Sequence, residues 1–351
     1  MRTMNYIDEI NTILQPQEDE RLKHTVVDLF AGCGGLSLGF EANGFKTVGY
    51  EKDKNACETY NLNLHGVCHN EELSIDTVYH TKTDILIGGP PCQPFSAFGR
   101  KLGLKDSRDG FPIFVSAVKQ IQPQIFLFEN VRGLLFERNK WYLEQIIETL
   151  EICGYHIDFK ILNAKYFKVP QNRERLFVVG YKNGKFEFPT KNNQIFVAGE
   201  ALGELAYQMP EDSKFLTQSM DEYIAKYEKA SYCIKPRDLY LDKPARTLTC
   251  RNIAAATSDM HRIKLSDGRR RRLTPQEASR LQSFPDWFQF TGDENSIFYQ
   301  IGNAVPPMLA YYLAQAIKKF ILNYDSQKSD ERMHFYSKRT KQLEMFRSIG
   351  V

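Results

Sequence analysis

The sequence predicts an α/β fold, in which a doubly wound and mostly parallel sheet carries helices on both faces. Short apolar runs alternate with segments of helical periodicity over the first half of the chain. A glycine-rich turn, 31–35, follows the first apolar run, which is where open α/β sheets bind ligands. After Gly184 the periodicity becomes irregular, so a smaller irregular domain is expected to be inserted near the C-terminal part.

Strands and helices are expected to alternate because the spacing of apolar residues switches between the two periods. The expected strands are Thr25–Phe30, Phe45–Tyr50, Asp84–Ile87, Ile125–Phe128 and Leu176–Tyr181. The expected helices are a short amphipathic one around Ile7, Ile10 and Leu14, a stretch from Leu36, Asp53–Leu64, Pro112–Ile121 and Trp141–Cys153.

The second half of the chain predicts two further parts. Helical order returns at Thr274, which opens a Thr-Pro-x-Glu capping signal, and a last regular helix is expected at Pro307–Leu322. We therefore assign residues 1–183 and 273–322 to the large domain and residues 184–272 to the inserted domain. The polar stretch 323–351 is expected to be a C-terminal tail.

Composition excludes several classes of protein. With 42% apolar and 25% charged residues the chain has an ordinary globular composition, and it has neither a signal-peptide core nor a membrane-length apolar stretch. Its seven cysteines are odd in number and form no CxxC pair, and the cluster Cys57, His65, Cys68 and His69 matches no common ligand spacing. We expect a cytoplasmic protein without a metal. A net charge of +3 permits nucleic acid as a partner without indicating it.

The glycine-rich turn within Asp28–Gly35 is the first candidate site. Its glycines let the backbone approach a ligand closely. Glu51 ends the second expected strand, about twenty residues later, where a carboxylate commonly accepts hydrogen bonds from ribose hydroxyls. The pattern fits NAD, with Ser37 in place of the third glycine, or another adenosine-containing cofactor, and a plain tight turn is the alternative. The two adjacent glycines and the phenylalanine before the turn favour S-adenosylmethionine.

A cysteine between prolines is the second candidate site. Cys92 lies in GGPPCQPFS, directly after the third expected strand, and the three prolines restrict the backbone around it. The thiol is thus expected at the same edge of the sheet as the glycine-rich turn. A proline-rich turn with an incidental cysteine is the alternative.

An acid and two arginines follow on neighbouring strands. Glu129 ends the next expected strand, and Arg173 and Arg175 are expected on one face of another strand, because side chains alternate along it. A surface acid and a solvated basic edge are the alternatives. Three successive strand ends that carry glycines, a thiol and an acid favour one shared site.

Six segments, in this order along the chain, resemble the motifs of the DNA cytosine-5 methyltransferase family of bacterial restriction-modification type. They are DLFAGCGG, GGPPCQPFS, FENVRG, PQNRERLFVVG, RRLTPQEASRLQSFPD and IGNAVP. The resemblance covers nearly the whole length and implies the S-adenosylmethionine-dependent methyltransferase fold. It also implies S-adenosylmethionine as the cofactor, no metal, and a specific double-stranded DNA sequence as the substrate.

The resemblance gives each catalytic candidate a role. Cys92 would be the nucleophile that adds to carbon 6 of cytosine, which makes carbon 5 nucleophilic enough to accept a methyl group. Glu129 would contact ring nitrogen 3 as a neutral acid, which requires a raised pKa. Arg173 and Arg175 would position the acid and the base. The cytosine must leave the duplex stack to be reached.

The cofactor site is assigned through the same resemblance. The residues expected to line it are Phe30, Gly32, Gly34, Glu51, Asn70 and Pro91, with Asn303 and Val305 closing it from the far end of the chain. The family usually has an aspartate before the strand that leads to the cysteine, where it meets the adenine amine. This chain has His-Asn-Glu-Glu there, so either Asn70 or Glu71 is expected to replace it.

DNA contacts are expected in two segments. The stretch Ala97–Gly110 is rich in glycine and basic residues, which suits a loop that closes over DNA and equally an ordinary surface loop. The inserted domain would recognise the target sequence, which cannot be decoded from its residues. The expected DNA-binding residues are Ser96, Arg100, Arg108, Thr247, Leu248 and Arg251. The run Arg269–Arg272 is expected to meet phosphates, and a solvated charge run is the alternative for Arg269 and Arg270.

Three other functions are weighed against this one. A tRNA cytosine-5 methyltransferase would carry a Cys-Phe-Thr signature, which this sequence lacks. A non-catalytic DNA-binding regulator would be expected to lose the thiol or the acid, and an NAD-dependent oxidoreductase rests only on the glycine-rich turn. We expect a monomer, with no membrane contact, whose cognate restriction endonuclease shares its target site without binding to it.

Overall fold

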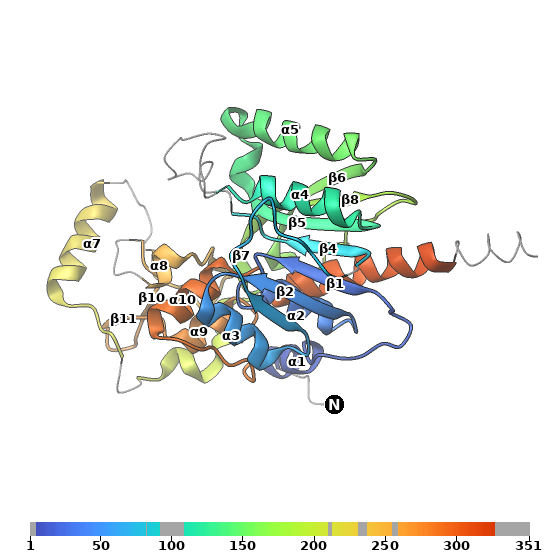
Figure 1. Cartoon of the computed structure of the whole chain (residues 1–351). Helices are drawn as coiled ribbons and strands as arrows, with labels where there is room; N and C mark the ends of the chain where they lie inside the picture. Colours follow the sequence, from blue (N-terminus) through green and yellow to red (C-terminus); the bar gives the residue numbers. More distant parts are fainter. Residues whose placement is uncertain are drawn as a thin grey trace, which may run out of the picture.

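The computed structural model describes residues 5–81, 83–91, 109–209, 213–230, 237–254 and 259–326. Its centre is a seven-stranded sheet with the order β3-β2-β1-β4-β5-β8-β6, and helices cover both of its faces (Figure 1). In this sheet β8 runs antiparallel to both of its neighbours, β5 and β6, and the other neighbouring strands are parallel to each other. The prediction of a doubly wound, mostly parallel α/β sheet is therefore confirmed.

Five of the seven strands lie where the apolar runs predict them. They are β1 (Thr25–Leu29), β2 (Lys46–Glu51), β4 (Ile85–Gly88), β5 (Ile125–Val131) and β8 (Glu174–Tyr181). The other two, β3 (Val67–Asn70) and β6 (His156–Asn163), are the edge strands of the sheet and were not predicted. Most of their residues are exposed or half-buried, so neither strand has the apolar run by which the other five are recognised.

The strand order reverses between β1 and β4, and this reversal fixes the place of the site. The chain runs from β1 outward through β2 and β3, then returns to pair β4 on the other side of β1. Leu29 pairs with Gly88 at the carboxyl ends of these two strands. Ligands of open α/β sheets bind at such a switch point, because the loops after the two strands diverge there.

Helices in the first half follow the predicted order with shifted ends. They are α1 (Tyr6–Ile13), α2 (Gly35–Glu41), α3 (Lys54–Asn63), α4 (Phe111–Ile121) and α5 (Glu137–Ile152), with the short 3-10 helices η3 (Arg132–Leu135) and η4 (Ala164–Tyr166). The side chains of Asn5 and Asp53 cap α1 and α3 by accepting hydrogen bonds from main-chain amides. Helix α5 begins four residues before the predicted Trp141.

The second half contains shorter elements. They are β7 (Gln171–Asn172), α6 (Ala198–Leu202), η5 (Gly203–Tyr207), α7 (Gln218–Ala230), β9 (Ala245–Arg246), α8 (Cys250–Ala254), β10 (Arg262–Lys264), β11 (Arg270–Arg272), α9 (Pro275–Leu281) and α10 (Glu294–Asn303). Thr274 and Glu277 form the predicted capping box at the start of α9. Residues 307–326 form a helix that passes the predicted end at Leu322. No described helix is both long and apolar enough to cross a membrane.

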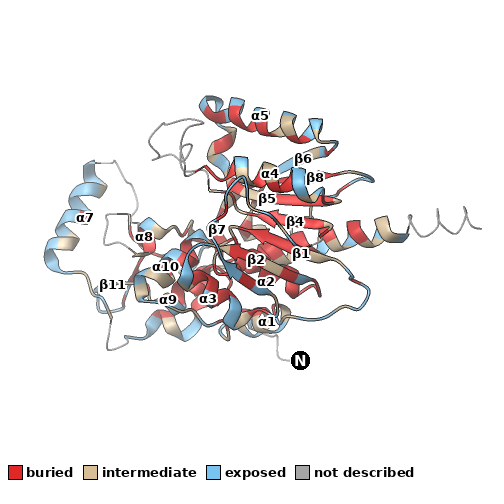
Figure 2. Ribbon diagram, viewed as in Figure 1, coloured by how far each residue is buried: buried red, intermediate tan, exposed pale blue. Residues whose placement is uncertain are grey.

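Two apolar layers lie on the two faces of the sheet, because successive strand residues point to opposite sides. Figure 2 shows that the central strands β1, β4 and β5 are mostly buried. Val26 belongs to the layer that includes α1, α2 and the helix 307–326, whereas Val27 belongs to the layer of α4 and α5. The first layer continues into the irregular region through Leu239, Leu248 and Ile263. Residues 184–272 therefore share the core of the sheet, and the domain boundaries stay a prediction.

A histidine pins the C-terminal helix to the sheet. His24, just before β1, is bonded through Nδ1 to Asp84 at 2.8 Å and through Nε2 to Asp325 at 2.9 Å. Burial alone would lower the pKa of His24, but the two carboxylates outweigh it and raise the pKa. The protonated ring therefore stabilises the fold, and this stabilisation is lost as the pH rises through the raised pKa.

We expect His24→Gln to lower the melting temperature more at pH 5.5 than at pH 8.5, because the wild-type ring carries more of its charge at the lower pH. Thermal melts of both proteins at the two pH values measure the difference. His80→Gln, which changes an exposed histidine, is the control. An equal loss at both pH values would contradict the assigned ion pairs.

Candidate active site

The turn after β1 is strained in the way a ligand-binding loop requires. Phe30 has a φ of 59°, which non-glycine residues rarely adopt, and Gly32 and Gly34 also have positive φ angles of 55° and 88°. Gly34 then precedes the first residue of α2. A Cβ placed on Gly32 would meet no atom within 4 Å, so this part of the turn borders open space.

Glu51 holds the turn from the neighbouring strand. Its Oε2 accepts a hydrogen bond from the Gly32 amide at 2.9 Å, and its Oε1 accepts one from the Asp53 amide at 2.8 Å. The Asn70 side chain donates to the main-chain oxygens of Glu51 and Lys52, both at 3.0 Å. The carboxyl ends of β1, β2 and β3 thus bring together residues that the sequence assigns to the cofactor.

A segment from the far end of the chain reaches the same turn. A Cβ on Gly35 would lie 2.6 Å from the Val305 oxygen, so only glycine allows this approach. The Cys33 thiol donates to the Gln300 oxygen at 3.7 Å. Asn303, the last residue of α10, accepts a hydrogen bond from the Cys250 thiol at 3.0 Å. Val305 therefore lies beside the glycine-rich turn, and Asn303 lies beside Cys250.

The loop that carries the predicted nucleophile is anchored at both of its described ends. The Asn130 side chain donates to the Pro90 oxygen at 2.9 Å, and the Gly110 amide donates to the Pro91 oxygen at 3.0 Å. Cys92, Ser96, Arg100 and Arg108 lie outside the described residues. Because Asn130 follows Glu129 directly, its hydrogen bond joins the cysteine-bearing loop to the strand that carries the acid.

Glu129 and Arg175 form a half-buried ion pair on one face of the sheet, with each side chain 13% exposed. Val131 is directly opposite Arg175 in the antiparallel β5–β8 pair, so Glu129, two residues before Val131, is the diagonal neighbour of Arg175. The Arg175 Nε lies 2.9 Å from the Glu129 Oε1. Burial raises the pKa of Glu129, and the nearby charges of Arg175 and Arg173 only partly offset this effect. The acid thus has the raised pKa that proton transfer to a base would require.

Arg173 lies in the one-residue break between β7 and β8 and is fully buried. Its guanidinium donates to the main-chain oxygens of Leu248 at 2.7 Å, Gly302 at 3.2 Å and Ala304 at 3.1 Å. Burial, and then repulsion from Arg175, lower the pKa of Arg173 to about 9, so it still carries its charge at neutral pH. Two arginines at alternate positions therefore have different partners.

The segment expected to contact DNA differs from the prediction at one residue. The Thr247 hydroxyl donates to the Asn172 oxygen at 2.7 Å, and Arg251 is exposed on α8. Leu248, in contrast, is 0% exposed and belongs to the main apolar core, so its side chain is not presented to DNA. The Leu248 side chain fills the core, while its main chain is hydrogen-bonded by the side chains of Gln171 and Arg173.

The arginine run is also different from the prediction, because its charges are paired within the chain. Arg269 pairs with Asp267 at 2.7 Å, and Arg270 pairs with Asp221. Arg271 is 0% exposed and makes two hydrogen bonds with Glu277. Arg272 donates to the Ala254 oxygen at 2.6 Å. Arg270, Arg271 and Arg272 thus connect β11 to the surrounding elements, whereas the exposed Arg269 pairs with Asp267, only two residues before it.

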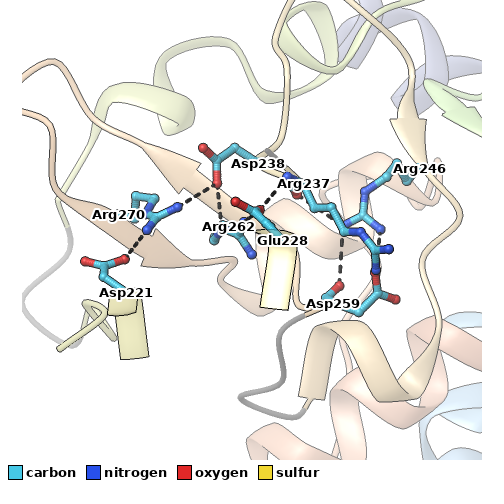
Figure 3. Close-up of polar contacts among 8 residues, drawn as sticks. All are labelled: Asp221, Glu228, Arg237, Asp238, Arg246, Asp259, Arg262 and Arg270. Atoms are coloured by element: carbon cyan, nitrogen blue, oxygen red, sulfur yellow. Dashed lines mark hydrogen bonds and ion pairs between the residues drawn. The ribbon is translucent and has the colours of Figure 1, made fainter. Parts of the chain in front are cut away.

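Further ion pairs stabilise the region around α7 and β10. Four acids alternate with four arginines across α7, β9, β10 and β11, as Figure 3 shows. The buried Arg262 joins Glu228 at 2.7 Å and Asp238 at 2.5 Å, while Arg237 and Arg246 share Asp259. Such a network gives an irregular region a defined shape because each buried charge needs its partner. In the part of the chain that the structure describes, no group of three or more His, Cys, Asp or Glu side chains could hold a metal.

The arrangement of turn, anchored loop, acid and arginines has a counterpart in a known family. The family model described as C-5 cytosine-specific DNA methylase matches residues 24–319. The chain belongs to this family. It is a DNA cytosine-5 methyltransferase. The family match favours this activity over the NAD-dependent oxidoreductase and the DNA-binding regulator, which the single motifs had left open.

Relatives and solved structures agree with this assignment. The Type II methyltransferase M.AplI of Arthrospira platensis is 49% identical over 97% of this methylase and 98% of its own length. M.PspPI of a Psychrobacter species is 36% identical over 85% of this chain and 80% of its own. The fold is similar to that of the S. pombe Dnmt2 methyltransferase, with a TM-score of 0.64, 19% identity, and coverage of 85% and 99% of the two chains.

Sequence analysis of this methylase missed three positioning residues. Asn130, Gln171 and Gln282 lie inside the family motifs, but no role was assigned to them. Each is buried, and each uses its side-chain amide to donate to a main-chain oxygen of another segment. An amide side chain next to apolar residues, as in Leu281-Gln282, is the signal that could have found them, because a buried amide needs partners.

We expect Asn130→Ala to lower kcat for DNA methylation by about tenfold or more, because the loop that carries Cys92 loses its anchor to β5 and small misplacements are costly in catalysis. Tritium transfer from labelled cofactor to DNA measures the rate. Asn43→Ala is the matched control, since Asn43 is also buried and donates to main-chain oxygens, but far from this loop. Equal rates for both variants would contradict the anchoring role.

Proposed function

We propose that this methylase transfers a methyl group from S-adenosylmethionine to carbon 5 of a cytosine that is turned out of a specific double-stranded DNA sequence. The observation that carries the proposal is the half-buried acid Glu129, whose pKa is raised and which is joined through Asn130 to the loop that leads into Cys92. Type II relatives support a role in host protection within a restriction-modification system. We further propose that it acts as a monomer.

The residues at the switch point fit an adenosine-containing methyl donor. The open space beside Gly32 leaves room for a ligand, and the Glu51 carboxylate stands where ribose hydroxyls would donate hydrogen bonds. Phe30, Gly34, Pro91, Asn303 and Val305 would complete the site, with Asn70 or Glu71 toward the adenine amine. When bound, S-adenosylmethionine supplies an electrophilic methyl group on a positively charged sulfur.

The chain's own residues perform the remaining steps. The Cys92 thiolate forms a bond to carbon 6, and the electron pair of the ring double bond moves to carbon 5. Glu129 donates a proton or a hydrogen bond to ring nitrogen 3, which makes this addition easier. Arg175 would hold both the acid and the base carbonyl, where negative charge develops. Once carbon 5 carries the methyl group, loss of its proton to a base restores the double bond between carbons 5 and 6 and expels the Cys92 thiolate.

DNA contacts are proposed near the carboxyl ends of the strands, where the catalytic candidates are expected. Thr247 and Arg251 would meet the duplex from the irregular region, and Ser96, Arg100 and Arg108 from the loop after Cys92. The exposed position of Arg251 supports its part, whereas Leu248 is proposed only to hold Thr247 in place. Extrusion of the cytosine costs a few kcal/mol, which contacts of this kind must offset.

The covalent step can be tested by trapping. Bisulfite sequencing of DNA from a host that expresses the methylase gives the target site, and a duplex with 5-fluorocytosine at that site is then supplied with S-adenosylmethionine. Because fluorine cannot leave as a proton does, we expect a complex that survives denaturing electrophoresis. Cys92→Ser should form no such complex, and Cys153→Ser should form it normally. A wild-type protein that is never trapped would refute the mechanism.

Proton donation by Glu129 makes a separate prediction. We expect Glu129→Gln to slow single-turnover methylation by about a hundredfold to ten-thousandfold, because the amide cannot transfer a proton to nitrogen 3. Glu174→Gln, on the adjoining strand and in an exposed pair with Arg132, is the control and should keep its rate. Near-normal turnover of Glu129→Gln would remove this acid from the proposed chemistry.

A further inference from the structure

We propose that the buried side chains of Gln171, Arg173 and Gln282 form a latch that couples DNA binding to cofactor binding. The latch joins the segment 247–250, proposed to meet DNA, to the segment 301–305, proposed to close over the cofactor. The inference rests on the proposed function, because it takes the two segments as parts of the two binding sites. A shift of one segment when its ligand binds would pass through the latch to the other segment, so that each ligand would raise the affinity for the other.

The DNA segment is held at Leu248 on both sides of the residue. The Leu248 amide donates to the Gln171 Oε1 at 2.9 Å, and the Leu248 oxygen accepts from the Arg173 Nη1 at 2.7 Å. All three residues are 0–1% exposed. Both main-chain groups of Leu248 are therefore satisfied by side chains from the β7–β8 region, and Leu248 cannot shift without breaking buried hydrogen bonds.

The cofactor segment is held by the same group of side chains. The Ala304 oxygen accepts hydrogen bonds from the Arg173 Nη2 at 3.1 Å and the Gln282 Nε2 at 2.8 Å. The Gly302 oxygen accepts from Arg173 at 3.2 Å, and the Ile301 oxygen accepts from Gln282 at 3.0 Å. Arg173 therefore donates to both segments at once.

The glutamines connect the two halves of the latch. The Gln171 Nε2 donates to the Gln282 Oε1 at 2.6 Å, so the residue that holds the Leu248 amide also holds the residue that bonds Ala304. Both glutamines are 0% exposed. A shift of either segment would leave polar groups unpaired in the core, which is costly.

The two segments also touch directly. The Cys250 thiol donates to the Asn303 Oδ1 at 3.0 Å. A Cβ on Gly302 would lie 2.5 Å from the Cys250 nitrogen, so the backbones approach each other as closely as glycine allows. Movement of residues 249–250 on DNA would therefore be transmitted to Gly302 and Asn303.

A coupling of this kind is reciprocal and can be measured as a ratio of affinities. Calorimetry gives the Kd of S-adenosylhomocysteine for the free methylase and for its complex with a duplex containing the target site. The ratio of the two values is the coupling factor, which is typically about 5- to 150-fold for linked sites. The product analogue is used because no methyl group is transferred during the titration.

We expect Gln282→Met to lower the coupling factor by about threefold or more, since the variant keeps the side-chain volume and loses its hydrogen bonds. Cys250→Ala should lower it by about twofold, and Cys250→Ser, which keeps a donor, should restore it. Cys153→Ala, a half-buried cysteine on the end of α5, is the matched control. A purely structural defect would not move the ratio, because both Kd values come from the same folded protein.

The outcomes separate the latch from the proposed function. A wild-type factor of one, or equal factors in all variants, would overturn the latch and leave the proposed function standing. If neither S-adenosylhomocysteine nor the target duplex bound to the wild-type methylase, both would fall. If Gln282→Met does not fold, the Cys250 pair decides the matter, since that side chain is only half-buried.

Discussion

The site depends on a carboxyl group, Glu129, that is held largely away from solvent between β5 and β8. Burial of Glu129 disfavours its ionised form, and the Arg175 guanidinium at 2.9 Å counteracts this only in part. The pKa of the acid therefore stays above its ordinary value, and a carboxyl group with a raised pKa is better able to donate a proton. The antiparallel direction of β8 is what makes the pair possible, because it places Arg175 diagonally across from the acid.

A second constraint concerns the other arginine, which has no carboxylate of its own. Arg173 is buried beside the same acid, and its charge is met by three main-chain oxygens from two distant segments. A buried cation needs such partners, so the two segments must be in place before Arg173 can be buried at low cost. Arg173 thus links two features of the site: its charge acts on Glu129, and its hydrogen bonds join the segment at Leu248 to the segment 302–304.

The sequence predicts the central strands, the capping box at Thr274 and the edge of the sheet at which the candidates meet, because each depends on local spacing. It fails for β3 and β6, since edge strands with exposed residues lack an apolar run. It also fails for Leu248 and for the arginine run, because charge and motif position do not tell whether a side chain faces solvent or a partner within the chain. The roles of Gln171 and Gln282 could not be predicted either, because the main-chain oxygens to which their side-chain amides donate lie far away in the sequence.

The contact between the first turn and the segment after α10 has a consequence for biosynthesis. Cys33 and Gln300 are 267 positions apart, and the Val305 oxygen lies against Gly35. A ribosome must therefore complete more than the first three hundred residues before Val305 can pack against the glycine-rich turn at the proposed cofactor site. Until then the nascent sheet lacks the helix 307–326 over one apolar face, and apolar surface exposed in this way favours aggregation of a partly made polypeptide.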